Sequence, residues 1–389
     1  MPLSTSSRKP RIVVAGQIPP PFGGQNVSIK QLVDDLSLDA SVETDRLEFR
    51  FTPEFKAVRA VGLNKLLESA RVVFRLFKLR VKGPIDLLVY PVGGPQSVPI
   101  LRDLILLPFI LIAARKLVLR FHAAGFANRK LQGDLLSKLA AALYRQASAA
   151  IVMTPYNRRD PQSCGIEEIE VLPHQLPDQF SEDHLSRSSE EQRLLYMGHL
   201  CLDKGTPYLL EAFAKIAARF PQAHLELAGE PLPPLSIETI QRDLIRLGIQ
   251  DRVTLLGLVR DEAKSAAFGR ANLFVFPSIA PYESYGRVTV EAMMWRLPIV
   301  ISDWRGNSDV VGREHGGVLY SIDGDMVSNL ENALQFALEN DGQWSAWGQR
   351  NRDRYLAHFG GSSPIVEVLK SYLSSNRVPS RQLALETEN

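Results

Sequence analysis

The stretch PYESYGRVTVEAMMWRLPIVIS, residues 281–302, decides the fold that we expect for this chain of 389 residues. It follows an apolar strand-like run at 272–276, turns at Gly286, continues with helical character and ends in a second apolar run. Seven residues separate Glu283 from Glu291, so a helix in this place would hold their carboxylates at most about 12 Å apart. Carboxylates accept hydrogen bonds from neighbouring hydroxyl groups, which favours one sugar-ring contact and one ribose contact.

The start of the expected helix adds backbone donors to the two carboxylates. The amides of Ser284, Tyr285 and Gly286 would point out of the helix N-terminus, where a phosphate or sugar oxygen is favoured. Two glutamates alone are more often surface residues beside a helix. The strand–turn–helix–strand context reverses that preference here.

Outward from this element, short apolar runs alternate with amphipathic segments along the whole chain, which is typical of α/β domains with parallel sheets. We expect a helix at 207–220, capped by Thr206. A polar segment at 181–192 predicts a linker between domains at 1–180 and 193–343. Strands are expected near 11–15, 46–51, 85–90, 117–121, 149–153, 169–172, 193–197, 223–228, 252–256, 272–276, 298–301 and 317–320.

A second candidate motif follows the first expected strand of the C-terminal half. It is MGHLCLDKG, residues 197–205, and it precedes the expected helix at 207–220. Lys204 can neutralise a leaving group that gains negative charge. His199 lies in the same loop. By itself, Asp-Lys-Gly is a common turn, so the motif gains weight only from its position and from the glutamate pair.

Two features of the N-terminal half are weaker. Gly23 and Gly24 follow the first strand and would let backbone approach a phosphate or an acceptor closely. Their spacing does not match the dinucleotide-binding fingerprint. His122 ends the strand LVLRF, where a histidine is usually only a polar residue at the start of a loop.

With both C-terminal motifs in place, the chain resembles glycosyltransferase family 4, a group of retaining enzymes with the GT-B fold. The resemblance rests on the E-x7-E element, on Glu291 to Val300 after it, and on the loop ending in Lys204 and Gly205. It implies two Rossmann-like parallel-sheet domains that face a central cleft. The N-terminal domain would bind the acceptor and the C-terminal domain the nucleotide sugar, with helices at 344–376 crossing back and a disordered tail at 377–389.

The resemblance also implies roles for the residues. Catalysis would involve Glu283, His122 and Lys204. The donor would be bound by Gly23, Gly24, His199, Lys204, Ser284, Tyr285, Gly286, Arg287 and Glu291. Family members usually carry Arg where this chain has His199, and a histidine lacks the permanent forked donor of Arg.

The function that follows is transfer of a sugar from a nucleotide diphosphate sugar, with retention, to a glycan or a lipid-linked acceptor. We expect a role in cell-surface polysaccharide or glycolipid synthesis. Two alternatives stay open: a nucleotide-sugar-binding protein without transfer activity, and a GT-B epimerase. A product assay separates them.

Composition narrows the partners. The net charge of +2 argues against a dedicated nucleic-acid binder. Cys164 and Cys201 form no disulfide framework, which favours a reducing, cytoplasmic location. The first ten residues are polar, so we expect no secretory signal peptide. The apolar run at 104–114 is too short to cross a bilayer and favours a buried helix. No metal or other cofactor is expected, and Asp323-Gly324-Asp325 is more typical of a turn than of a metal site.

The segment 56–82 suggests a peripheral membrane contact. Its apolar residues recur at helical spacing, and basic residues including Lys65, Arg71, Arg75, Lys78 and Lys82 lie on the neighbouring face. We expect the apolar stripe to pack on the sheet and the basic face to meet an anionic membrane. A core helix with a solvated polar side is the alternative.

Overall fold

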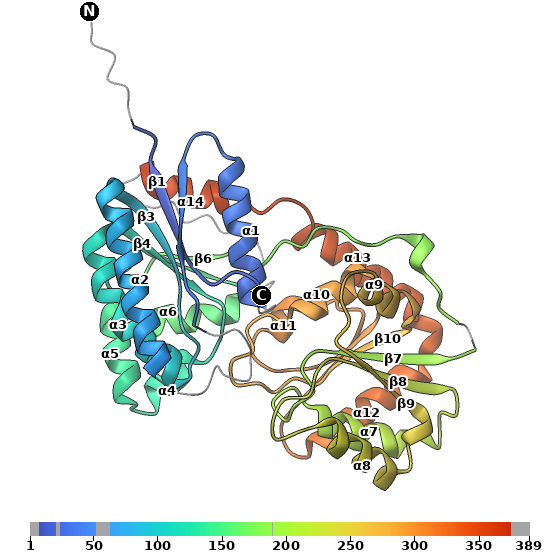
Figure 1. Cartoon of the computed structure of the whole chain (residues 1–389). Coiled ribbons are helices and arrows are strands. Elements are labelled where there is room, and N and C mark those ends of the chain that lie inside the picture. The colour runs from blue at the N-terminus through green and yellow to red at the C-terminus, as the bar shows by residue number, and fades with distance from the viewer. Residues whose placement is uncertain (1–7, 21–23, 52–62, 189, 375–389) are drawn as a thin grey trace, which may run out of the picture. The chain divides into compact units, whose positions relative to one another are not determined.

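The computed structural model describes residues 8–20, 24–51, 63–188 and 190–374. Gly23, residues 56–62 and the expected tail at 377–389 lie outside these ranges. The chain divides into two compact units (Figure 1). Unit 1 contains the chain up to His174 and again from Ser363, and unit 2 contains Gln175–Ser362.

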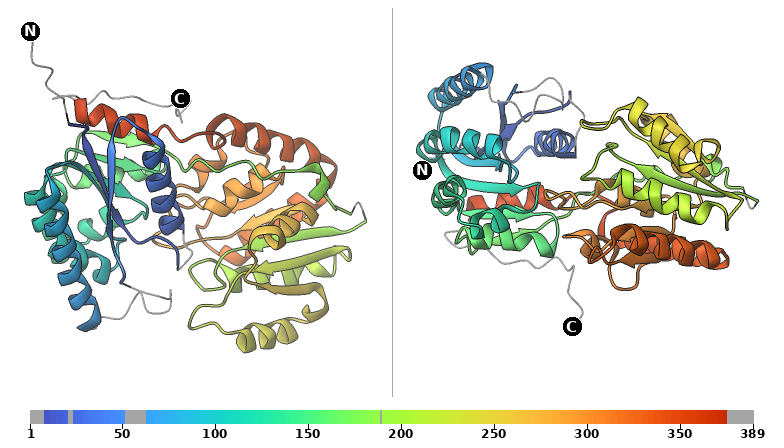
Figure 2. Two further views of the ribbon diagram at one scale, coloured as in Figure 1. Left: turned by 45° about the horizontal axis from the view of Figure 1, so that its top comes forward. Right: turned by 90° about the horizontal axis from the view of Figure 1, so that it is seen from below.

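Unit 1 is built on a six-stranded sheet with the order β2-β1-β3-β4-β5-β6, in which all paired strands are parallel. Its helices cover both faces, with α2, α3 and α5 side by side on one of them (Figures 1 and 2). The strands are β1 (Arg11–Gly16), β2 (Glu43–Glu48), β3 (Ile85–Pro91), β4 (Ala114–Phe121), β5 (Ala149–Val152) and β6 (Ile169–Val171). The helices are α1 (Gly24–Leu38), α2 (Leu63–Lys82), α3 (Ser97–Ala113), α4 (Phe126–Leu131), α5 (Leu135–Tyr144), α6 (Arg159–Ser163) and α14 (Ile365–Ser374).

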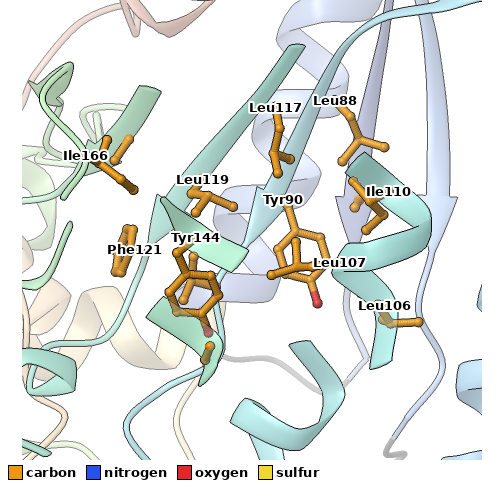
Figure 3. Close-up of a cluster of buried hydrophobic side chains, with 14 of the residues drawn as sticks. Leu88, Tyr90, Leu106, Leu107, Ile110, Leu117, Leu119, Phe121, Tyr144 and Ile166 are labelled. Atoms are coloured by element: carbon orange, nitrogen blue, oxygen red, sulfur yellow. The ribbon is translucent and has the colours of Figure 1, made fainter. Parts of the chain in front are cut away.

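The core of unit 1 lies between the sheet and the helices α2, α3 and α5 (Figure 3). The carboxylate of Asp103 is fully buried among these apolar side chains. The Asp103 carboxylate accepts hydrogen bonds from the hydroxyls of Tyr90 (2.7 Å) and Tyr144 (2.6 Å) and pairs with Arg102 at 2.7 Å. Because every one of these groups finds a partner, the buried carboxylate ties α3 to the sheet and to α5.

Unit 2 repeats the architecture with the strand order β12-β11-β10-β7-β8-β9, again parallel. The strands are β7 (Gln192–Met197), β8 (Ala223–Ala228), β9 (Val253–Gly257), β10 (Leu273–Phe276), β11 (Ile299–Ser302) and β12 (Gly317–Tyr320). The helices are α7 (Thr206–Ala217), α8 (Ile237–Leu247), α9 (Asp261–Arg270), α10 (Arg287–Met294), α11 (Asn307–Val311), α12 (Met326–Glu339) and α13 (Trp344–His358).

The expected two Rossmann-like sheets are therefore present, and each strand expected from the sequence has its counterpart. The boundary between the units differs from the prediction. It lies at 174/175, and the expected linker at 181–192 packs on unit 2 instead. The His184 ring lies 6.1 Å from the Trp295 ring, and the Ser186 amide donates to the Gly269 carbonyl at 3.2 Å. These contacts come from residues distant in sequence, which polar composition does not reveal.

The helices expected to cross back at 344–376 divide between the units. α13 belongs to unit 2, where the Asn351 amide donates to the carbonyls of Leu297 (2.7 Å) and Gly316 (2.8 Å). α14 belongs to unit 1, where Lys370 pairs with Asp39 at 2.7 Å. The return of the chain to unit 1 thus occurs at 362/363.

Candidate functional site

The strand order of unit 2 places its two motif loops next to each other. The chain runs outward through β7, β8 and β9 and then returns to the other side of β7 as β10. Ligands of such sheets bind at the carboxyl ends of the strands where this reversal occurs. The loop with Lys204 follows β7, and the loop with Glu283 follows β10. The Ile279 amide donates to the Asp203 carbonyl at 2.9 Å and fixes one loop against the other.

Glycine at position 205 is required by this close approach. Gly205 has a φ of +78°, and a Cβ there would collide with the carbonyl oxygen of Pro277. Gly205, rather than Thr206, precedes the helix as its N-cap. The Thr206 hydroxyl instead accepts a hydrogen bond from the Cys201 amide at 3.1 Å, so our expectation of a Thr206 cap was wrong. Its hydroxyl closes the loop because the loop turns back over the helix start.

Lys204 and Glu283 form the centre of the site. The Lys204 ammonium lies 2.5 Å from the Glu283 carboxylate, which also accepts a hydrogen bond from the Ser278 hydroxyl at 2.6 Å. Both side chains are largely buried, with 16% and 8% of their area exposed. Lys204 has three donors, so it can hold Glu283 and still contact an anionic group.

Glu291 forms a second buried acidic position on α10. Its Oε1 lies 2.7 Å from the Lys264 ammonium and 3.5 Å from the Arg287 guanidinium. Its Oε2 is buried and has no hydrogen-bond partner among the described residues. An acceptor oxygen in this state is suited to a ligand hydroxyl, because leaving it unsatisfied carries a desolvation cost.

Hydrogen bonds and close packing fix the loop that leads from β10 to α10. Gly286 has a φ of +59° and is the N-cap of α10. The Trp304 indole donates to the Ala280 carbonyl at 2.8 Å, and the Ser302 hydroxyl donates to the Ser278 carbonyl at 2.6 Å. The Tyr285 ring is buried edge-on against Phe359 at 5.9 Å, so Tyr285 offers a ligand its backbone rather than its hydroxyl.

His199 lies in the β7 loop near Lys204. Its carbonyl accepts a hydrogen bond from the Tyr196 hydroxyl at 2.7 Å. Burial, followed by the charge of Lys204, lowers the pKa of the His199 imidazole below its usual value. A base with a lowered pKa is protonated only in more acidic solution, so His199 supplies no positive charge at neutral or alkaline pH.

We therefore expect His199→Arg to leave transfer activity equal or to raise it, with the largest gain at alkaline pH. Arginine would add a charge beside Lys204 at every pH above the pKa of His199. Steady-state rates of both proteins between pH 6 and 9 check this expectation. A large loss at all pH values would mean that the imidazole has a role of its own.

The structure thus brings together Glu283, Lys204, His199, Arg287 and Glu291 in unit 2, with the amides of Ser284, Tyr285 and Gly286 between them. Gly24 and His122 belong to unit 1, at the start of α1 and directly after β4. Gly23 lies outside the described residues. The ligand atoms that these residues contact stay a prediction.

Two residues of the site, Ser278 and Lys264, were not predicted from the sequence. Ser278 follows β10 directly, so the rule that ligands meet the carboxyl ends of strands could have singled it out. Lys264 precedes Glu291 by 27 positions on another helix, and no spacing pattern links them. The Asp-Gly-Asp sequence has a structural role, since the Asp325 carboxylate accepts a hydrogen bond from the Val327 amide and caps α12.

Comparison with known sequences covers mainly unit 2. Residues 191–340 match a family model described as "Glycosyl transferases group 1". The chain is similar to the alpha-D-kanosaminyltransferase of Streptomyces kanamyceticus, with 27% identity over 181 residues, which are 43% of this chain and 45% of the relative. The matched part therefore spans less than half the length of this curated relative.

Comparison of structures covers both units. The sucrose-phosphate synthase from Thermosynechococcus elongatus superimposes with a TM-score of 0.70 and 20% identity, over 90% of this chain and 95% of that one. HepE from Anabaena, solved in complex with UDP, gives a TM-score of 0.64 and 18% identity over 93% and 98% of the two chains. At this identity the likeness shows the fold alone, which is GT-B.

Proposed function

We propose that the protein transfers a sugar from a nucleotide diphosphate sugar with retention of configuration. The match of residues 191–340 to the model of the group 1 glycosyl transferases supports sugar transfer. The observation that carries this proposal is the buried pair of Lys204 and Glu283 at the reversal point of the unit 2 sheet, followed on α10 by the buried Glu291. The HepE relative, solved with UDP, supports a nucleotide donor.

In this proposal the side chains of the site bind different parts of the donor. The Oε2 of Glu291 accepts hydrogen bonds from the ribose hydroxyls. Lys204 and the amides of Ser284 to Gly286 stabilise the diphosphate as it gains charge. Glu283 contacts the donor sugar while Lys204 and Ser278 hold its carboxylate in place. The protein therefore acts by positioning and by charge stabilisation, and the departing phosphate oxygen accepts the proton of the acceptor hydroxyl.

The donor can be identified by thermal unfolding with a panel of nucleotide diphosphate sugars. We expect nucleotide sugars with one particular base to raise the midpoint temperature of unfolding of the wild-type protein. In Glu291→Ala most of this increase should be lost. Glu226→Ala is the matched control, since Glu226 is also a buried glutamate that pairs with an arginine, Arg270, at 2.9 Å. Binding without transfer or hydrolysis would favour the nucleotide-sugar-binding alternative instead.

We further propose that the acceptor is glycosylated at an anionic membrane surface, which α2 contacts. The orientation of α2 differs from our expectation, because Val72, Leu76 and Leu79 face the core. The apolar stripe that we predicted, which includes Leu66, Phe74, Phe77 and Val81, faces outward instead. Phe77 is 64% and Val81 72% exposed. The helix has two apolar faces, and hydrophobic spacing does not tell which one packs on the sheet.

The neighbouring helices extend this apolar surface. α2 packs beside α3, and α3 beside α5. Helix α3 was expected to be buried, but only one of its faces is. The exposed large apolar side chains of the three helices are Leu66, Leu67, Phe74, Phe77, Val81, Leu101, Ile105, Phe109, Ile112, Leu135 and Leu139. Large apolar side chains exposed on three adjacent helices favour an interaction site over an ordinary solvated face.

The same helix α2 carries basic side chains, as electrostatic attraction to anionic lipid requires. Arg71, Lys78 and Lys82 are exposed on it. Arg75 does not belong to this group, contrary to our expectation, because its side chain is only 29% exposed and donates both to the buried Glu68, at 2.7 Å, and to the Glu48 carbonyl, at 2.8 Å. In the described part of the chain, none of the helices is long and apolar enough to cross a membrane.

We expect the full protein to sediment with anionic liposomes at low salt. Arg71→Glu/Lys78→Glu/Lys82→Glu should bind more than roughly 100-fold more weakly, because losing the three positive charges alone costs about 3 kcal/mol at about 1 kcal/mol per charge, and the three new negative charges add repulsion. Lys215→Glu/Arg219→Glu/Arg246→Glu in unit 2 is the control with equal charge change. If wild type stays in the supernatant, the basic face only solubilises the protein, and the lipid-linked acceptor loses its main support.

A further inference from the structure

We propose that Arg120, together with Ser28 and His174, forms an oxyanion site in unit 1 that binds a phosphate group of the acceptor. All three residues are buried, and Arg120 has only 5% of its area exposed. The inference rests on the proposed function only in naming the acceptor as the carrier of the phosphate. That a site for an oxyanion exists follows from unit 1 alone.

The guanidinium of Arg120 is buried without a matching anion. Its Nε and Nη1 atoms have no hydrogen-bond partner among the described residues. Within the same residues no ion pair joins it to a carboxylate. Burial lowers the pKa of Arg120 to about 10, and the charge of Asp35 acts in the opposite direction from beyond ion-pair distance. An uncompensated buried charge is strongly destabilising, so a guanidinium in this state is suited to an anion that the structure does not contain.

The neighbours of Arg120 supply further hydrogen-bonding groups. Its Nη2 lies 3.5 Å from Nδ1 of His174, and the Ser28 hydroxyl lies 2.9 Å from the same nitrogen. A guanidinium only donates, so Nδ1 of His174 is the acceptor and its proton is on Nε2. The His122 ring stacks on the His174 ring, with 5.6 Å between centroids and an interplanar angle of 14°.

The location of these residues fits a ligand site rather than a structural cluster. Arg120 is the penultimate residue of β4, and His122 and His174 follow the carboxyl ends of β4 and β6. Ser28 lies in the second turn of α1, whose N-terminus meets the same edge of the sheet because α1 follows β1. The half-buried His122 stacks on His174 beside this cluster.

The chemistry of the site selects the ligand. A guanidinium presents a planar fork of donors that matches two oxygens of a phosphate. Ser28 fixes the His174 ring by donating to its Nδ1, and burial lowers the pKa of the neighbouring His122 well below its usual value, so His122 is neutral. One fixed positive charge with neutral groups around it favours an oxyanion over a neutral sugar.

Arg11 offers a matched control. It is also buried, at 2% exposure, but it pairs with Asp45 and donates to the Leu79 carbonyl at 2.8 Å. Removing a buried guanidinium that pairs with a carboxylate should destabilise the protein. Removing a buried guanidinium that has no such carboxylate among the described residues should not.

The test is thermal unfolding with inorganic phosphate, against chloride at equal ionic strength, in the Lys204→Gln background that weakens phosphate binding in unit 2. We expect phosphate to raise the midpoint and Arg120→Met to abolish this rise. Without phosphate, Arg120→Met should unfold at the same temperature as the Lys204→Gln protein or at a higher one. Arg11→Met should unfold at a lower temperature, and phosphate should still raise its midpoint. Should Arg120→Met fail to fold, Ser28→Ala is expected to reduce the rise.

Two outcomes overturn the proposal: a phosphate effect that persists in Arg120→Met and Ser28→Ala, or no phosphate effect at all. Glycerol 3-phosphate distinguishes the source, since a site for acceptor phosphate accepts a monoester and a site for the free ion does not. Nucleotide titration of Arg120→Met separates this proposal from the proposed function. Unchanged nucleotide binding is expected, and its loss would mean that Arg120 supports the fold instead.

Discussion

Lys204→Ala is expected to lower the rate of sugar transfer by roughly 100- to 1,000-fold, the usual effect of removing a group that stabilises developing charge. Lys204 is the cation that the structure places on the β7 loop beside Glu283, at the reversal point of the sheet. The loss should be in the turnover number, because the diphosphate gains its extra charge only as the glycosidic bond breaks. Single-turnover kinetics at saturating donor measure it.

A control must separate this effect from loss of folding. Lys204→Ala leaves the largely buried Glu283 without its cation, and breaking a buried pair costs about 3–5 kcal/mol. Lys204→Gln keeps a hydrogen bond to Glu283 but removes the charge. A rate close to that of wild type in a folded Lys204→Gln protein would contradict the role of this charge.

Glu283→Ala and Glu291→Ala are expected to fail in different ways. Glu291→Ala should weaken nucleotide binding by roughly 5- to 150-fold, which corresponds to about 1–3 kcal/mol for the lost partner of a ribose hydroxyl. Glu283→Ala should lower turnover more than nucleotide affinity, because its carboxylate faces the donor sugar. Calorimetric titration with the free nucleotide, followed by kinetics at saturating donor, separates the two effects.

Glu226→Ala controls for the loss of a buried glutamate as such. It should leave nucleotide affinity unchanged, since the partner of Glu226 is Arg270 on α9 and not a residue of the site. Equal losses of affinity in Glu283→Ala and Glu291→Ala would contradict the division of tasks between sugar and ribose.

The sheets could be predicted because both units bury their strands. Val13, Leu88 and Phe274 lie in runs that are apolar on both faces, and parallel strands covered by helices require such runs. Gly205 and Gly286 lie where the backbone adopts a positive φ, which favours glycine. The two loops could therefore be predicted from their glycines as well.

What could not be predicted depends on contacts between distant residues. Lys264 reaches Glu291 from another helix. Arg120 has no counter-ion among the residues that the structure describes, and this follows from what surrounds it in the fold. The face of α2 that packs on the sheet was chosen wrongly, since Phe77 and Leu76 are equally apolar. The face of α2 with Leu76 packs against the sheet, and the spacing of apolar residues does not distinguish it from the face with Phe77.

The most direct test of the central claim follows the wild-type protein by ¹H NMR with the nucleotide diphosphate sugar that stabilises it most, with water as the acceptor. We predict release of the nucleoside diphosphate, together with a first-formed sugar of the same anomeric configuration as the donor. A first-formed sugar of inverted configuration, or release of a nucleoside monophosphate, would contradict it.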